Sequence, residues 1–100
     1  MPENQPIELN RAVPGGRVEL FATRDEYPGD WFYQFQYYHP EEGEFLRYDN
    51  AHDDDDLGWH HRHVRFGEDS EIPFQNISAH VARFLQEVVH LTDIEDTNHD

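Results

Sequence analysis

Cysteine and lysine are absent from this 100-residue chain, and no apolar run approaches the length of a membrane span. Without cysteine the chain has no disulfide framework, no thiolate nucleophile and no zinc ribbon. Residues 1–6 lack the basic and apolar segments of a signal peptide, so we expect a cytoplasmic protein. The length suits one core, and we predict a single domain over residues 1–100.

Basic charge is scarce as well. The chain has 22 aspartates and glutamates against seven arginines, and its formal net charge is −15 with eight histidines neutral. Such a surface is typical of halophilic proteins, because at 1 M salt the Debye length falls to about 3 Å and self-repulsion is screened. The acidity argues against nucleic-acid contacts over the average surface but leaves room for a local basic patch. An aromatic content of 14% disfavours disorder.

The alternation of apolar and polar residues predicts four antiparallel β-strands, over residues 17–23, 31–38, 44–49 and 59–66. Apolar positions at helical spacing from Ile77 to Leu91 predict an amphipathic helix, with Asn76 or Ser78 as its N-cap. We therefore predict an α+β fold, a four-stranded antiparallel meander with one C-terminal helix packed on one face.

The remaining segments have simpler interpretations. Residues 1–15, rich in proline and glycine, are expected to form an irregular arm before a folded core over 16–91, and residues 92–100 a polar tail. His80 and His90 lie on or near the predicted helix, where solvent exposure or charge pairing at the helix end is the ordinary expectation. The sheet face away from the helix would collect polar side chains, namely Gln34, Gln36, Arg47, Asp49, His61, His63 and Arg65.

Chemistry-bearing residues concentrate between Arg47 and Arg65, where half of the eight histidines fall. Histidine, with an unperturbed pKa of about 6.5, transfers protons near neutrality, and arginine holds phosphate in a bidentate fork. These are the parts of a metal-independent ribonuclease. One histidine would deprotonate a ribose 2′-hydroxyl, a second acid would protonate the leaving 5′-oxygen, and an arginine would stabilise the phosphorane.

On this hypothesis His61 and His63 act as acid and base, and Asp49 orients a histidine. Arg47 and Arg65 would contact phosphate. The predicted substrate-binding residues are Arg65, Arg62, Tyr48, His52 and His60. The hypothesis requires no cofactor.

Two other interpretations stay open. His61 and His63 alternate on a strand, a spacing suited to joint binding of a divalent metal with His52 or Asp49 as third ligand. Alternatively, the histidines are structural and are hydrogen-bonded within a polar sheet face. The four aspartates at 53–56 lack the spaced ligands and glycine of a calcium loop, so we expect a solvated loop there.

Two short motifs carry a resemblance to a known family: Arg47-Tyr48-Asp49-Asn50-Ala51-His52 and, after a loop, His60-His61-Arg62-His63. They resemble the TumE-like family of small toxins, found in bacteria and haloarchaea and usually encoded beside a DNA-binding antitoxin. Looser similarity extends from about Val18 to Leu91. The resemblance implies a haloarchaeal toxin of a type II toxin–antitoxin pair that cleaves messenger RNA.

The resemblance also implies partners. These are a cognate helix-turn-helix antitoxin and an RNA substrate, with a homodimer left open and no membrane. A basic antitoxin segment docking over the acidic residues 53–56 would neutralise charge and block the histidines. The alternative is a non-enzymatic module that binds a partner or a metal through the same motif.

Overall fold

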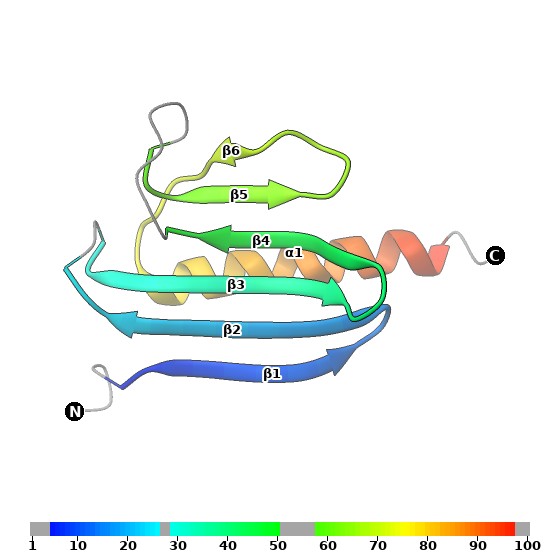
Figure 1. The fold of residues 1–100 in the computed structure, drawn as a ribbon, viewed down its shortest axis with the longest axis horizontal. Helices are drawn as coiled ribbons and strands as arrows, with labels where there is room; N and C mark the ends of the chain where they lie inside the picture. Colours follow the sequence, from blue (N-terminus) through cyan, green and yellow to red (C-terminus); the bar gives the residue numbers. More distant parts are fainter. Residues whose placement is uncertain (1–4, 27–28, 51–57, 98–100) are drawn as a thin grey trace.

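The computed structural model describes residues 5–26, 29–50 and 58–97. Within these residues, six antiparallel strands form one sheet, and one helix lies against one face of it (Figure 1). Neighbours in the sheet follow sequence order: β1 (Ile7–Val13), β2 (Gly16–Arg24), β3 (Trp31–His39), β4 (Gly43–Asp49), β5 (His61–Val64) and β6 (Ser70–Glu71). The predicted α+β class, the meander and the C-terminal helix are confirmed, whereas the prediction of four strands is wrong.

Strand β1 corrects the prediction of an irregular arm over residues 1–15. It pairs with β2 from Ile7 opposite Ala22 to Val13 opposite Gly16. The prolines at 6 and 14 flank the strand rather than interrupt it, and proline is tolerated at the ends of an edge strand. Gly15, with a φ of 82°, supplies the left-handed residue of the β1–β2 turn.

The second additional strand, β6, is only two residues long and pairs with β5. Its neighbour β5 covers residues 61–64 and is shorter than the strand predicted over 59–66. Phe66 adopts a positive φ of 65° and is 95% exposed, so the extended backbone ends before it. This turn lets the chain return along β5 before it enters the helix.

Helix α1 (Ile77–Thr97) begins where the sequence predicts it. The side-chain oxygen of Asn76 accepts a hydrogen bond from the backbone N–H of Ala79 at 2.8 Å, which confirms Asn76 as the N-cap. The helix continues six residues beyond Leu91, so the tail predicted over 92–100 is helical to Thr97. No glycine or proline interrupts residues 77–97, and polar residues alone do not end a helix. Within the part of the chain described here, no helix has the apolar length needed to cross a bilayer.

The core fills the space between α1 and the inner face of the sheet. Phe84 of α1 packs edge-on against Tyr48 and lies 5.6 Å from the ring of Phe35, measured between centroids. Each such buried side chain contributes about 1.5–3 kcal/mol. Val18, Leu20, Trp31, Tyr33 and Phe35, which strand alternation predicts to face the helix, are buried, whereas Phe66, predicted with them, is 95% exposed. The other buried apolar side chains of the strands are Ala22, Tyr37, Leu46 and Tyr48.

His80 is part of this core, contrary to the expectation that it is exposed. It is 2% exposed, and its ring lies 4.8 Å from that of Tyr33 and 4.9 Å from that of Phe74. Burial, and secondarily the nearby His60 and Arg83, lower the pKa of His80 to about 3. Its Nε2 atom has no hydrogen-bond partner among the described residues. The helix thus carries a neutral imidazole into an aromatic cluster.

Candidate active site

The register of β4 and β5 brings four predicted site residues together on the sheet face opposite α1. Asp49 lies opposite His61, and Arg47 lies opposite His63. Directly opposite residues in an antiparallel pair have Cβ atoms about 4.5–5.5 Å apart, so their side chains touch. Arg47, Asp49, His61 and His63 therefore lie on the outer face of β4 and β5, as the strand alternation predicts.

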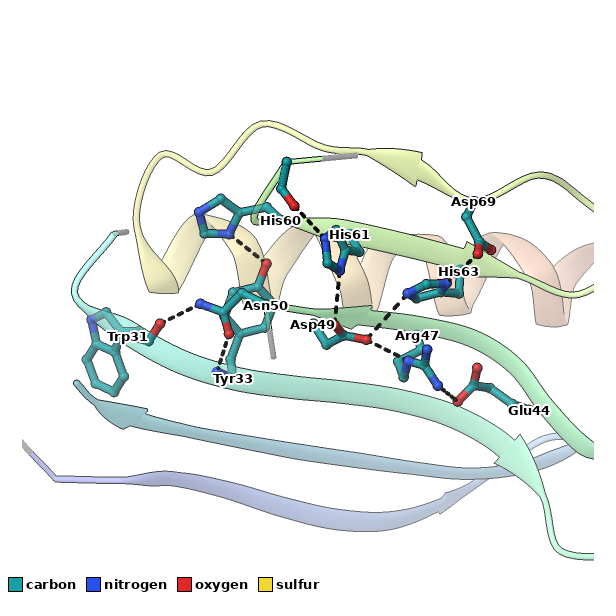
Figure 2. A network of polar contacts seen from close by, with 11 residues as sticks. Trp31, Tyr33, Glu44, Arg47, Asp49, Asn50, His60, His61, His63 and Asp69 are labelled. Carbon is teal, nitrogen blue, oxygen red and sulfur yellow. Dashed lines mark hydrogen bonds and ion pairs between the residues drawn. The ribbon is translucent and has the colours of Figure 1, made fainter. Parts of the chain in front are cut away.

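Asp49 is the centre of this group, as Figure 2 shows. Its Oδ2 atom accepts a hydrogen bond from Nε of Arg47 at 2.6 Å. Its Oδ1 lies 3.3 Å from Nδ1 of His61, and its Oδ2 lies 3.5 Å from Nε2 of His63. Arg47 also pairs with Glu44 at 3.3 Å. One carboxylate therefore contacts both histidines and the guanidinium.

Each histidine is held from its other side as well. Nε2 of His61 lies 2.6 Å from the carbonyl oxygen of Gly58, and Nδ1 of His63 lies 3.0 Å from Oδ2 of Asp69 (Figure 2). The two rings differ in access: the His61 side chain is 2% exposed and that of His63 is 21% exposed. His63 is thus the imidazole within reach of a molecule on the open face.

Tyr48 and Arg62, predicted to bind substrate, lie on the inner face and are separated from this cluster. The Tyr48 hydroxyl donates a hydrogen bond to Glu87 of α1, and Nε of Arg62 donates to the same carboxylate at 2.9 Å. Burial alone would raise the pKa of Glu87, but the bonds from Arg62 and Tyr48 lower it. These three side chains fasten the helix to β4 and β5.

His60 and Arg65 are also apart from the Asp49 cluster. His60 stacks on Phe74 with 4.6 Å between ring centroids, and its Nδ1 shares a 2.9 Å hydrogen bond with the Tyr33 hydroxyl. Burial, and then the neighbouring His61, lower its pKa. The guanidinium of Arg65 lies over the ring of Phe45 at 5.3 Å. His52 and the aspartates at 53–56 lie outside the described residues.

Asn50 has a structural role that the sequence analysis missed. It is fully buried at the end of β4, where its Oδ1 accepts from the backbone N–H of Tyr33 and its Nδ2 donates to the carbonyl of Trp31. The Asn50 side chain thereby forms two hydrogen bonds with the backbone of β3 that the backbone of a paired strand would otherwise form (Figure 2). The only sequence signal for this role was an asparagine directly after a predicted strand.

The first motif, at residues 47–52, thus contributes to both faces of the sheet, as does the second. A family model described as Toxin TumE matches residues 7–92, which include both motifs. The chain belongs to the TumE toxin family. The resemblance seen in the sequence is therefore confirmed, and TumE membership implies a toxin role and an antitoxin partner. No curated protein and no solved structure matches this TumE-family chain.

Proposed function

We propose that this TumE-family toxin acts in a type II toxin–antitoxin pair by cleaving RNA without a metal ion. The observation that supports the proposal is the Asp49 cluster. It holds an imidazole and a guanidinium within reach of a molecule on the outer sheet face, since the side chains of His63 and Arg47 are 21% and 31% exposed. An imidazole that transfers protons and a guanidinium that binds phosphate suit RNA cleavage by a 2′-hydroxyl.

In the proposed reaction His63 accepts the proton of a ribose 2′-hydroxyl while the 2′-oxygen attacks the adjacent phosphorus. Arg47 stabilises the charge that develops on the phosphorane oxygens. The bond from phosphorus to the 5′-oxygen breaks, and protonated His63 returns the proton to that oxygen. The products are a 2′,3′-cyclic phosphate and a 5′-hydroxyl, so atoms and charge balance.

The other two members of the cluster support this pair. Asp49 contacts both Arg47 and His63 and so fixes their separation. His61, predicted as the second proton carrier, is too buried to touch RNA in this structure, and we assign it the role of positioning Asp49.

Arg65 stays in the proposal as a second phosphate-binding residue. Its guanidinium lies 4.9 Å from the centroid of the Phe66 ring, and Phe66 is almost fully exposed. An exposed aromatic ring beside an arginine suits a stacked nucleobase next to a phosphate.

The antitoxin is proposed to be a helix-turn-helix DNA-binding protein with a basic segment. A chain of formal charge −15 attracts such a segment electrostatically. Docking over the Asp49 cluster would remove Arg47 and His63 from contact with RNA, which is the inhibition expected of an antitoxin.

The decisive experiment measures cleavage of a synthetic single-stranded RNA by the purified chain in EDTA. The variants His63→Ala and Arg47→Gln are expected to lower the rate at least 100-fold, since a positioned acid–base group contributes about 10²–10⁴-fold. His39→Ala, at the far end of β3, is the matched control and is expected to retain the wild-type rate. Circular dichroism confirms that each variant is folded. Cleavage by His63→Ala at the wild-type rate would refute the assignment, and growth arrest without any cleavage would favour a binding module.

A further inference from the structure

We infer that Asp49, His61 and His63 bind one divalent transition-metal ion, for which Zn²⁺ is the best match. Ligand atoms of all three side chains already lie within 4.8 Å of one another. Two imidazoles and a carboxylate form a donor set that suits zinc and its neighbours in the first transition row. Binding itself does not depend on RNA cleavage, and only its regulatory consequence rests on the function proposed above.

The hydrogen bonds of the two rings favour a cation at their centre. A neutral imidazole has one N–H donor and one acceptor nitrogen. In His61 and His63 alike, both ring nitrogens face oxygen acceptors, so a neutral ring can donate to only one of them. The shorter contacts are those to Gly58 and Asp69, at 2.6 and 3.0 Å. If the N–H donates there, the remaining lone pair of each ring points toward Asp49.

A lone pair directed at a carboxylate is repulsive unless a proton or a metal ion lies between them. A metal ion on the Asp49 side satisfies both rings and the carboxylate at once. The outer contacts then match the usual second shell of a metal site, in which each ligating histidine donates its other N–H to a backbone carbonyl or a carboxylate. Here Gly58 supplies the carbonyl for His61, and Asp69 supplies the carboxylate for His63.

The distances are close to those of a filled site. Zinc binds nitrogen and oxygen at about 2.0–2.2 Å, so neighbouring ligand atoms in a tetrahedron lie about 3.4 Å apart. Nδ1 of His61 lies 3.3 Å from Oδ1 of Asp49, and Nε2 of His63 lies 3.5 Å from Oδ2. One ligand atom from each of the three residues lies within 4.8 Å of the other two. Coordination therefore requires side-chain rotations that bring the ligand atoms closer together, while the pairing of β4 and β5 stays unchanged.

Local charge also favours a cation. Among the described residues, the cluster and its ion-pair partners contain three carboxylates, on Glu44, Asp49 and Asp69, and one guanidinium, on Arg47. The formal charge of these four groups is −2, which a divalent ion neutralises. Arg47 donates to Oδ2 of Asp49, and Oδ1 of the same carboxylate lies toward Nδ1 of His61.

Three protein ligands leave a fourth zinc position, which the partial exposure of His63 directs toward the open face. Coordination through Nε2 would occupy the lone pair with which His63 is proposed to accept the proton. A bound metal ion would therefore inhibit the proposed RNA cleavage, and metal release would restore it.

The test is a calorimetric titration of the untagged, EDTA-stripped full chain with ZnCl₂, and with MgCl₂ for comparison. We expect one Zn²⁺ per chain and no measurable binding of Mg²⁺, which prefers oxygen ligands. His63→Ala and Asp49→Asn are each expected to weaken Zn²⁺ binding at least 10-fold. Asp69→Asn is expected to weaken it about 10-fold through the second shell. His39→Ala is the control and is expected to bind as the wild type does.

A second readout covers the case in which a variant misfolds. Titration of the wild-type chain with CoCl₂ is expected to produce the visible absorption bands of four-coordinate Co²⁺, which ZnCl₂ abolishes by displacement. Absence of these bands, or a Zn²⁺ stoichiometry unchanged in folded His63→Ala, would overturn the metal site.

RNA cleavage measured in the same samples separates the two proposals. Zn²⁺ binding together with inhibited cleavage supports both. Cleavage in EDTA without any Zn²⁺ binding overturns the metal site alone. Zn²⁺ binding without cleavage under any condition, or with cleavage only when the metal is present, supports the site and overturns metal-free catalysis.

Discussion

Burial of His80 makes a quantitative prediction about stability and pH. Its pKa is 6.5 when unperturbed and about 3 in the folded chain. Below pH 6.5 the unfolded chain therefore binds a proton that the folded chain does not, and the free energy of unfolding falls as the pH decreases toward 3. Each pH unit in this window costs about 1.4 kcal/mol, so lowering the pH from 7 to 5 costs about 2 kcal/mol through this residue.

The variant His80→Leu isolates this contribution. It replaces the imidazole with an apolar side chain of similar size and removes the Nε2 atom that lacks a partner among the described residues. Urea unfolding followed by tryptophan fluorescence at fixed KCl gives the free energy of unfolding at pH 7 and pH 5. The loss between these pH values is expected to be about 2 kcal/mol smaller in His80→Leu than in the wild type.

The control is His90→Leu, because His90 lies on the same helix and is exposed. It is expected to follow the wild-type pH dependence. An identical pH dependence for the wild type and His80→Leu would refute the reasoning, since it would show that His80 is protonated equally in the folded and unfolded chains.

Three further predictions concern stability. A double-mutant cycle that replaces Arg62 and Glu87 with methionine is expected to give a coupling energy of about 1–2 kcal/mol by urea unfolding, because both side chains are largely shielded from solvent. Additive effects of the two substitutions would contradict a role of this ion pair in holding the helix. Asn50→Leu is expected to cost about 2–3 kcal/mol and to lower the Tm by roughly 10–20 °C in calorimetry, through loss of its bonds to Trp31 and Tyr33; an unchanged Tm would argue against it. Raising KCl from about 0.1 M to about 2 M is expected to raise the Tm of this acidic chain, because a Debye length below about 3 Å screens the repulsion between its carboxylates. An unchanged Tm would count against a halophilic surface.

The part of the site that the sequence predicts correctly is the part that depends on local periodicity. Alternation along β3, β4 and β5 is enough to place Arg47, Asp49, His61 and His63 on one face. Because the side-chain period of a strand is two, this assignment requires no knowledge of what packs on the sheet.

What the sequence does not reveal depends on distant partners. Arg62 and Tyr48 have side chains suited to binding RNA, but Glu87, 25 residues beyond Arg62, neutralises the arginine from the helix. β1 is held by pairing with β2, and its proline-bounded sequence gives a weak local signal. The positions of Arg62 and Tyr48 and the formation of β1 both depend on contacts between separate elements, which local sequence patterns do not show.

The alternation of β4 and β5 between the two faces has a genetic consequence. Shifting β4 by one residue would move Tyr48 to the outer face and turn Asp49 toward the core. Shifting β5 by one residue would do the same to Arg62 and His61. Deleting a single codon in frame within residues 43–49 or 61–64 would therefore disperse the cluster and bury charge in one event. Among cells that survive expression of this toxin, we expect such in-frame deletions as well as premature stop codons. Unlike a stop codon, an in-frame deletion leaves the rest of the chain translated.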